Sequence, residues 1–120
     1  MADSKTGIEL IAEERSRQVS AEGYDAAHDD EHGDGDLAWA AVCYAAPERV
    51  FCRKSYSSGV AFLDPWPWSQ HDDRRPYIGN LPGFAPAGSE ERLRLLVKAG
   101  ALIAAEIDRM QRARRKVSDG

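Results

Sequence analysis

The chain has 120 residues, a length that suits one domain with a modest hydrophobic core. Its 16 Lys and Arg against 20 Asp and Glu give a net charge of −4, so it lacks the basic excess of a protein that coats long nucleic acid. No apolar run approaches membrane-spanning length, and the first residues carry no apolar signal core. We therefore expect a cytoplasmic protein without a membrane partner.

The first predicted element is a helix over about residues 6–19. Thr6, followed three residues later by Glu9, is a capping-box signature that marks the start of this helix. A second helix is expected over about 36–46, where residues 37–46 are almost all apolar and Pro47 ends the run. Residues 25–35 are open between helix and loop, because Gly33 and Gly35 both weaken a helix.

Residues 47–88 form the least regular part of the sequence. They contain all six prolines and most of the aromatic residues. A disordered linker is poor in Trp and Phe, so we expect an ordered, irregular excursion that packs on the helices. Cys43 and Cys52 form no C-x-x-C pair, and we expect both to be reduced thiols.

The last predicted helix covers about residues 89–116, with Ser89 as its N-cap. Apolar residues repeat along it at alternating spacings of three and four, which is typical of a helix-packing seam. The seam consists of Leu93, Leu96, Gly100, Ile103, Ile107 and Met110. This seam packs either against the other helices of the same chain or against a second copy in a dimer. The fold class expected for the whole chain is all-α, a single domain of three or four helices with the long excursion before the last one.

The strongest candidate site is the segment from His28 to Asp36. If this segment is helical, His28, His32 and Asp36 lie on one face with Asp29 beside them. Imidazoles and carboxylates that converge in this way can hold a divalent cation, and the excess of carboxylates favours Mg²⁺ or Mn²⁺. The alternative is a solvated acidic loop in which Asp36 caps the next helix.

Two further features extend the candidate site. Glu106 shares a helix face with apolar residues, so its carboxylate is predicted to turn inward and, with Glu14, to complete the metal site; the alternative is a surface ion pair with Arg109 or Arg92. Trp66 and Trp68 lie on a proline-stiffened arm that leads to Arg74 and Arg75. Indoles can stack on nucleobases and arginines can pair with phosphate, although both indoles could equally fill the core.

Several stretches of the chain together resemble a family of small bacteriophage and prophage proteins. The matching runs are Glu13-Glu14-Arg15-x-Arg17-Gln18, His28-Asp29-Asp30-x-His32, Asp36-Leu37-Ala38-x-Ala40-Ala41-x-Cys43-Tyr44-Ala45, Trp66-Pro67-Trp68 and Leu96-Val97-Lys98-Ala99-Gly100-Ala101-Leu102-Ile103-x-Ala105-Glu106-Ile107. Such proteins are called MazG-like, after the all-α nucleoside triphosphate pyrophosphohydrolases.

The resemblance implies an oligomeric helical bundle in the cytoplasm of the host cell, with carboxylates that bind Mg²⁺ over the phosphates of a nucleotide. Carried over to this sequence, Glu14, His32, Asp36 and Glu106 are the expected metal ligands. The first functional hypothesis is metal-dependent hydrolysis of a nucleoside triphosphate that releases pyrophosphate, with Asp29 as the base that activates water. The alternatives are non-catalytic sequestration of a small nucleotide signal used in anti-phage defence, and a partner-binding helical protein whose acidic segment mimics nucleic acid.

Overall fold

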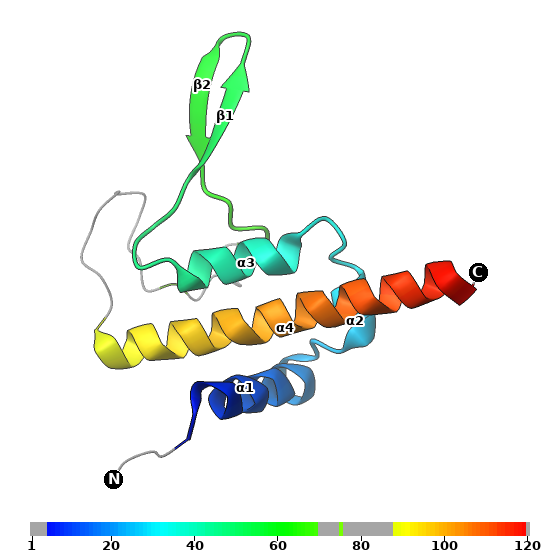
Figure 1. Ribbon diagram of the computed structural model, residues 1–120. Helices are drawn as coiled ribbons and strands as arrows, with labels where there is room; N and C mark the ends of the chain where they lie inside the picture. The colour runs from blue at the N-terminus through cyan, green and yellow to red at the C-terminus, as the bar shows by residue number, and fades with distance from the viewer. Residues whose placement is uncertain (1–4, 70–74, 76–87, 120) are drawn as a thin grey trace.

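The computed structural model describes residues 5–69, 75 and 88–119. In chain order the elements are α1 (Gly7–Glu22), α2 (Ala26–Asp30), α3 (Asp36–Ala45), β1 (Cys52–Tyr56), β2 (Gly59–Leu63) and α4 (Ser89–Asp119). The long helix α4 runs through the middle of the molecule, with α1 and α3 on opposite sides of it (Figure 1). Helix α2 lies beside the carboxyl-terminal half of α4, to which Arg112 ties it through a 2.8 Å contact with Asp30.

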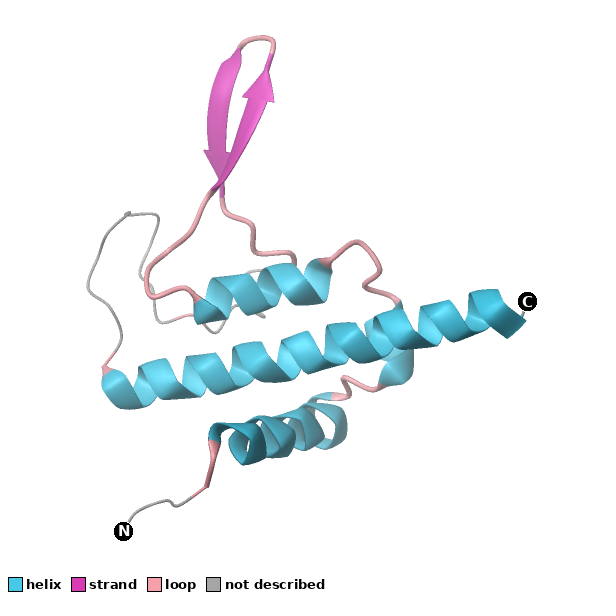
Figure 2. Cartoon of the chain, viewed as in Figure 1, coloured by secondary structure: helices cyan, strands magenta, loops and turns pink. Residues whose placement is uncertain are grey.

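The all-α prediction is wrong, because the described chain contains an antiparallel β-hairpin as well as four helices (Figure 2). The hairpin pairs Cys52 with Leu63 and Tyr56 with Gly59, and it projects away from the helices. Its two-residue turn is Ser57-Ser58, and Gly59, the first residue of β2, has a positive φ of 140°, a conformation that favours glycine. The sequence hides this hairpin because β1 is mostly polar and shows no alternation of buried and exposed residues.

Local signals at the ends of the helices explain where they begin and stop. The hydroxyl of Thr6 accepts a hydrogen bond from the Glu9 backbone, and the Glu9 carboxylate accepts one from the Thr6 backbone, so the predicted capping box is confirmed. Helix α1 continues three residues beyond the expected end and stops at Gly23, which has a φ of 72°. Ser89, predicted as the N-cap of the last helix, is instead the first residue of α4.

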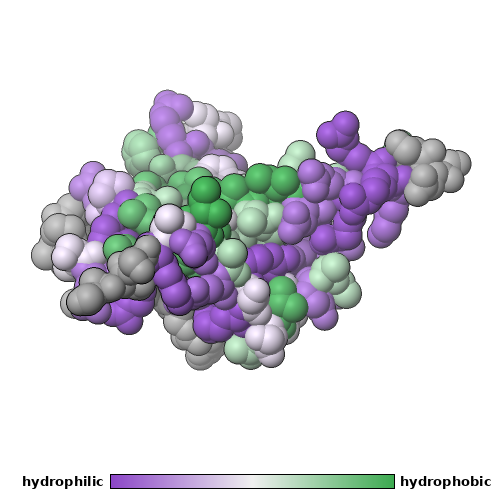
Figure 3. Space-filling model, turned by 60° about the horizontal axis from the view of Figure 1, so that its bottom comes forward, coloured by the Kyte–Doolittle hydropathy of each residue, from purple (hydrophilic) through white to green (hydrophobic). Residues whose placement is uncertain are grey.

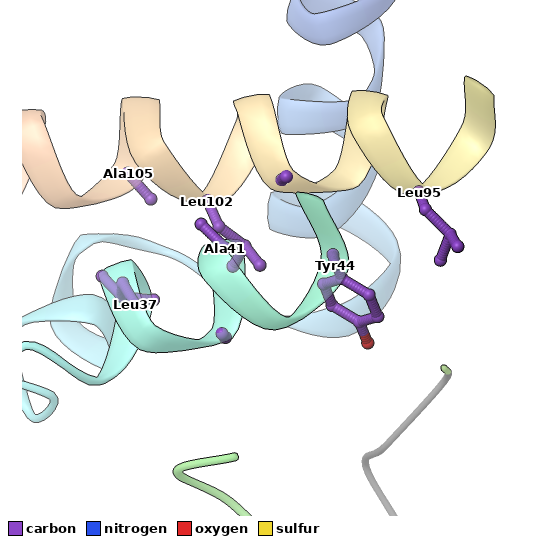
Figure 4. Packing of buried hydrophobic residues seen from close by; sticks show 8 residues of the cluster. Leu37, Ala41, Tyr44, Leu95, Leu102 and Ala105 are labelled. Atoms are coloured by element: carbon purple, nitrogen blue, oxygen red, sulfur yellow. The ribbon is translucent and has the colours of Figure 1, made fainter. Parts of the chain in front are cut away.

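The hydrophobic core is the contact between α3 and α4 (Figure 4). Leu37, Ala41 and Tyr44 of α3 face Leu102 and other small or aliphatic side chains of α4. Ala40, Leu95, Ala99 and Ala105 complete the buried cluster. The many alanines bring the two helices close together. The Arg92 guanidinium donates to the carbonyls of Tyr44 and Ala45 at the end of α3 and, at 2.9 Å, to that of the C-cap Ala46.

An ion-paired anchor fixes the chain that returns from the hairpin. The Asp64 carboxylate accepts hydrogen bonds from Arg49 at 2.7 Å and from Arg75 at 2.9 Å. The Asp64 side chain also accepts from the Trp66 backbone, and the Arg75 guanidinium lies 5.2 Å from the centre of the Trp66 ring. This part of residues 47–88 is therefore ordered, as expected; residues 70–74 and 76–87 lie outside the described part of the chain.

The predicted helix-packing seam is largely not used within the chain. Its residues Leu96, Ile103, Ile107 and Met110 remain about half exposed, between 46% and 51%, whereas the core takes the neighbouring face of α4. Figure 3 shows hydrophobic side chains gathered over the middle of one face of the molecule, with hydrophilic ones towards its ends. None of the described helices combines the length and the apolar character that crossing a membrane requires.

Candidate functional site

Two neighbouring cavities lie where the end of α1, α2, α3 and α4 meet the Trp-containing chain that follows β2. The first, of about 250 Å³, is lined mainly by polar and charged side chains, and we call it the charged cavity. The second, of about 360 Å³, is lined mainly by rings, and we call it the aromatic cavity. Tyr24, Trp68 and Glu22 line both cavities. The two cavities are therefore two halves of one candidate site.

A continuous row of ring contacts runs along this site. Tyr24 stacks on His28 at 4.6 Å between ring centres, and His28 contacts His32 at 4.7 Å. The row continues to Trp68 at 5.5 Å and from there to Trp66 at 5.4 Å. It ends at Tyr44 of α3, which contacts Trp66 at 5.4 Å. The structure thus joins the two histidines and the two tryptophans, which the sequence presented as separate candidate sites.

The charged cavity holds a carboxylate that stays ionised. Glu14 of α1 accepts from Arg17 through both oxygens, at 2.8 and 2.7 Å. Burial alone would raise the pKa of the Glu14 carboxyl, but the hydrogen bonds and charge of Arg17 outweigh it and bring the pKa below its ordinary value of 4.5. Arg17 also pairs with Glu22 at 3.0 Å, so its charge is fully matched inside the cavity.

Lys98 is the second cation of the charged cavity. Its ammonium lies 5.7 Å from the centre of the Tyr44 ring, and it forms no ion pair within the part of the chain that the structure describes. Because α4 holds it between the buried residues Leu95 and Leu102, its stem is fixed beside the core. Lys98 is therefore available to bind an anionic group.

His32 makes two contacts that compete for one nitrogen. Its Nδ1 lies 3.2 Å from a carboxylate oxygen of Asp36 and 3.3 Å from the indole Nε1 of Trp68. The indole only donates and the carboxylate only accepts, so a protonated Nδ1 satisfies Asp36 while an unprotonated Nδ1 satisfies Trp68. The predicted pair of His32 and Asp36 is thus brought together, with Trp68 as a third member that spacing alone did not indicate.

Asp29, the predicted base, lies behind the site rather than in it. Its side chain is 0% exposed and accepts from Arg15 at 2.7 Å, while His28 lies 3.2 Å away on its other oxygen. Arg15 also donates to the Tyr24 carbonyl at 3.0 Å. The pair therefore fixes the start of α2 against α1 and holds Tyr24 and His28 in the ring row.

Glu106 accepts from Arg109 at 2.7 Å one turn along α4, but this is not the surface ion pair of the alternative, since the two side chains are only 13% and 16% exposed. It forms no hydrogen bond or ion pair with His32, Asp36 or Glu14 in the described chain. No three His, Cys, Asp or Glu side chains among the described residues gather closely enough to hold a metal ion. The residues predicted to bind Mg²⁺ or Mn²⁺ therefore do not form one ligand set, and each has a protein partner instead.

The Trp-containing arm divides between the site and the anchor. Both indoles pack against the core, but Trp68 also lines both cavities, whereas Trp66 lines neither and donates to the Ser69 carbonyl at 3.0 Å. Arg75, predicted to bind phosphate, is buried and holds Asp64. Arg74 lies outside the described residues.

Sequence reasoning did not single out Tyr24, Gln18 or Lys98 as site residues. Tyr24 lies just before Asp25, the N-cap of α2, so no helical spacing in the sequence indicated that it would stack on His28. Lys98 lies in an otherwise apolar stretch of α4. A charged residue in such a stretch indicates a partner or a ligand, because charged side chains are rarely buried alone. Gln18 carries no signal in the sequence and is identified only by its burial.

The chain was compared with protein-family models, with curated proteins and with solved structures, and no match was found. Function must therefore be argued from the geometry of the site.

Proposed function

We propose that this protein binds a small nucleotide in the two joined cavities. The observation that carries the proposal is that rings of one row line both cavities and that the row ends beside the ammonium of Lys98, which forms no ion pair with the described residues. A nucleotide combines a flat aromatic base with an anionic phosphate. Base stacking on Tyr24, His28 or Trp68 and phosphate pairing with Lys98 would use both halves of the site.

The aromatic half suits a base for a physical reason. Stacking on aromatic side chains contributes about 1–3 kcal/mol per base and tolerates different bases. The charged half suits the polar remainder of the ligand, since its wall carries carboxylate, amide and ammonium groups. Sequestration of a nucleotide signal of host anti-phage defence is the use that the resemblance to phage proteins suggests.

The test is a thermal-shift and calorimetric screen of nucleotides, with and without Mg²⁺ or Mn²⁺. A ligand at one hundred times its dissociation constant should stabilise the protein by about 2.7 kcal/mol. Lys98→Met should weaken binding roughly tenfold or more, because the ligand loses a charge-assisted contact. Lys116→Met, an exposed lysine at the far end of α4, should leave affinity unchanged. Absence of any nucleotide binding would overturn the proposal.

Metal-dependent hydrolysis is the second candidate, favoured by the ionised carboxylate of Glu14 in the wall of the charged cavity. This activity predicts pyrophosphate release that needs Mg²⁺ or Mn²⁺ and that Glu14→Gln abolishes. Ligand recovered intact after denaturation of the complex would support binding without turnover. Recovery of a cleaved nucleotide would support hydrolysis.

We further propose that the protein works as a homo-oligomer. The support is the exposed stripe Leu96, Ile103, Ile107 and Met110 on α4, which leaves a row of apolar side chains uncovered within one chain.

A further inference from the structure

One side chain of the charged cavity, that of Gln18, is buried and has a polar atom without a hydrogen-bond partner among the described residues. Gln18 of α1 is only 3% exposed, and its Oε1 has no hydrogen-bond partner in the described chain. Its Nε2 donates to Glu14 at 3.3 Å, so turning the amide over would bring its oxygen against a carboxylate and is disfavoured. A buried acceptor without a donor costs about 1–3 kcal/mol. A protein can keep such an unsatisfied acceptor when a bound ligand supplies the missing donor.

The position of this acceptor limits what the donor can be. Gln18 and Glu14 lie one turn apart on α1, and both line the charged cavity. The Glu14 oxygens keep lone pairs beyond those used by Arg17, so the wall offers two adjacent acceptor groups. Two adjacent acceptors match two adjacent hydroxyl groups, which donate a hydrogen bond each.

The two ends of the nucleotide already have partners in the proposed arrangement. In that arrangement the base would occupy the aromatic cavity and the phosphate would pair with Lys98. Glu14 and Gln18 line the charged cavity together with Lys98, so the sugar that joins base and phosphate would lie against them. Gln18 Oε1 is buried in the free protein, but the 3.3 Å hydrogen bond from Nε2 to Glu14 is long. A partial turn of the soft terminal amide torsion therefore brings Oε1 to the ligand without exchanging the amide oxygen and nitrogen.

We propose that Gln18, with Glu14, accepts hydrogen bonds from the ribose hydroxyls of the ligand, so that the site selects ribonucleotides over deoxyribonucleotides. This inference rests on the proposed nucleotide binding. A deoxynucleotide would leave an acceptor buried and unpaired, which is the most effective way for a site to reject an analogue that lacks one hydroxyl.

The experiment compares ATP, GTP, CTP and UTP with their 2′-deoxy counterparts by calorimetry on the full chain. Each ribonucleotide that binds should bind about 10- to 100-fold more tightly than its deoxy form. Gln18→Leu should remove most of this preference by weakening the ribonucleotide. The melting temperature of the free variant should not fall, because the substitution removes an unsatisfied buried group. Gln111→Leu, an exposed glutamine on α4, should keep the preference unchanged.

The possible failures differ from one another. Equal affinity for both sugars, or a preference that survives in Gln18→Leu, would overturn the ribose inference while nucleotide binding stands. Absence of binding for all eight nucleotides would overturn the proposed function and this inference with it. The comparison on the unmodified protein decides the inference even if Gln18→Leu fails to fold.

Discussion

The buried pair of Asp29 and Arg15 shows how a single residue can look catalytic in sequence and be structural in the fold. The Asp29 carboxylate is inaccessible, and the Arg15 side chain is 18% exposed, so both charges have left most of their water. Each therefore depends on the other for compensation. The pair also positions two rings of the row. Arg15 donates to the Tyr24 carbonyl, and His28 of α2 contacts the Asp29 carboxylate.

Asp29→Ala should lower the free energy of unfolding by about 3–5 kcal/mol, because it leaves the Arg15 charge partly buried and unpaired. Urea denaturation followed by circular dichroism measures this change. Glu31→Ala serves as control, since Glu31 is exposed and forms no ion pair with the described residues, and it should cost only a small fraction of that loss. Similar losses for both variants would contradict the structural role assigned to Asp29.

Asp64 makes stability depend on acid pH. Burial would raise the pKa of its carboxyl, but Arg75 and Arg49 outweigh this and lower the pKa from 3.8 to about 2. A depressed pKa in the folded state means that the stabilisation is complete above the unfolded pKa of 3.8 and is lost as the pH falls towards about 2.

The difference in urea midpoint between the wild type and Asp64→Asn should therefore be constant from neutral pH down to about pH 4 and then shrink. Urea titrations at intervals between pH 6 and 2 measure this difference. A gap that stays constant down to pH 2 would show that Asp64 is not held ionised by its arginines.

At the scale of the elements, the packing of α1 on α4 depends on a glycine that has no conformational role. A Cβ built on Gly100 would lie 2.5 Å from Cδ1 and 2.8 Å from Cγ1 of Ile11. Gly100 thus lets α1 approach α4 closely, and this approach places Glu14 and Gln18 opposite Lys98 in the charged cavity. The closeness of the two helices is therefore a condition of the site.

Gly100→Ala should destabilise the protein, because overpacking costs about 1–3 kcal/mol and the gain in helix propensity is only about 1 kcal/mol. In an Ile11→Ala background the clash is absent, so the same substitution should raise the free energy of unfolding. A double-mutant cycle from chemical denaturation measures the reversal of sign. Additive effects of the two substitutions would contradict the contact.

The hairpin is the element that is least supported by the rest of the chain. Its strands pair with each other, and Tyr56, Val60 and Phe62 remain exposed. A two-stranded hairpin without further packing is marginally stable. We expect its backbone amides to exchange with deuterium far faster than those of the α3–α4 core, as measured by exchange mass spectrometry. Protection equal to that of α4 would show that something covers the hairpin.

At the scale of the whole molecule, the main feature is the exposed apolar stripe of α4, formed by Leu96, Ile103, Ile107 and Met110. A single chain leaves Ile103 and Ile107 about half exposed on adjacent turns, which favours association with a second copy. The double variant Ile103→Lys/Ile107→Lys should reduce the molecular mass measured by light scattering to that of one chain. Val42→Lys alters a comparably exposed apolar residue on α3 and should leave the mass unchanged. A wild type that is already monomeric would contradict the oligomer proposal.

The sequence by itself determined those features that depend on neighbours along the chain. The capping box at Thr6, the apolar run of α3 and the long α4 are all visible there, because helix hydrogen bonds and caps join residues three or four apart. The pairing of His32 with Asp36 also joins residues four apart, although not on one helix: His32 lies in the connection between α2 and α3, and Asp36 is the first residue of α3.

Only the tertiary structure decided which distant groups meet. In the fold, Asp29 pairs with Arg15 and Asp64 pairs with Arg75. Trp68 contacts His32, from which it is separated by 36 positions in the sequence. It also chose the Leu95–Leu102 face of α4 for the core in place of the predicted seam, because the small residues there let α3 pack closely. Charges and apolar faces are satisfied by whichever partner the fold brings within reach, and sequence spacing does not specify that partner.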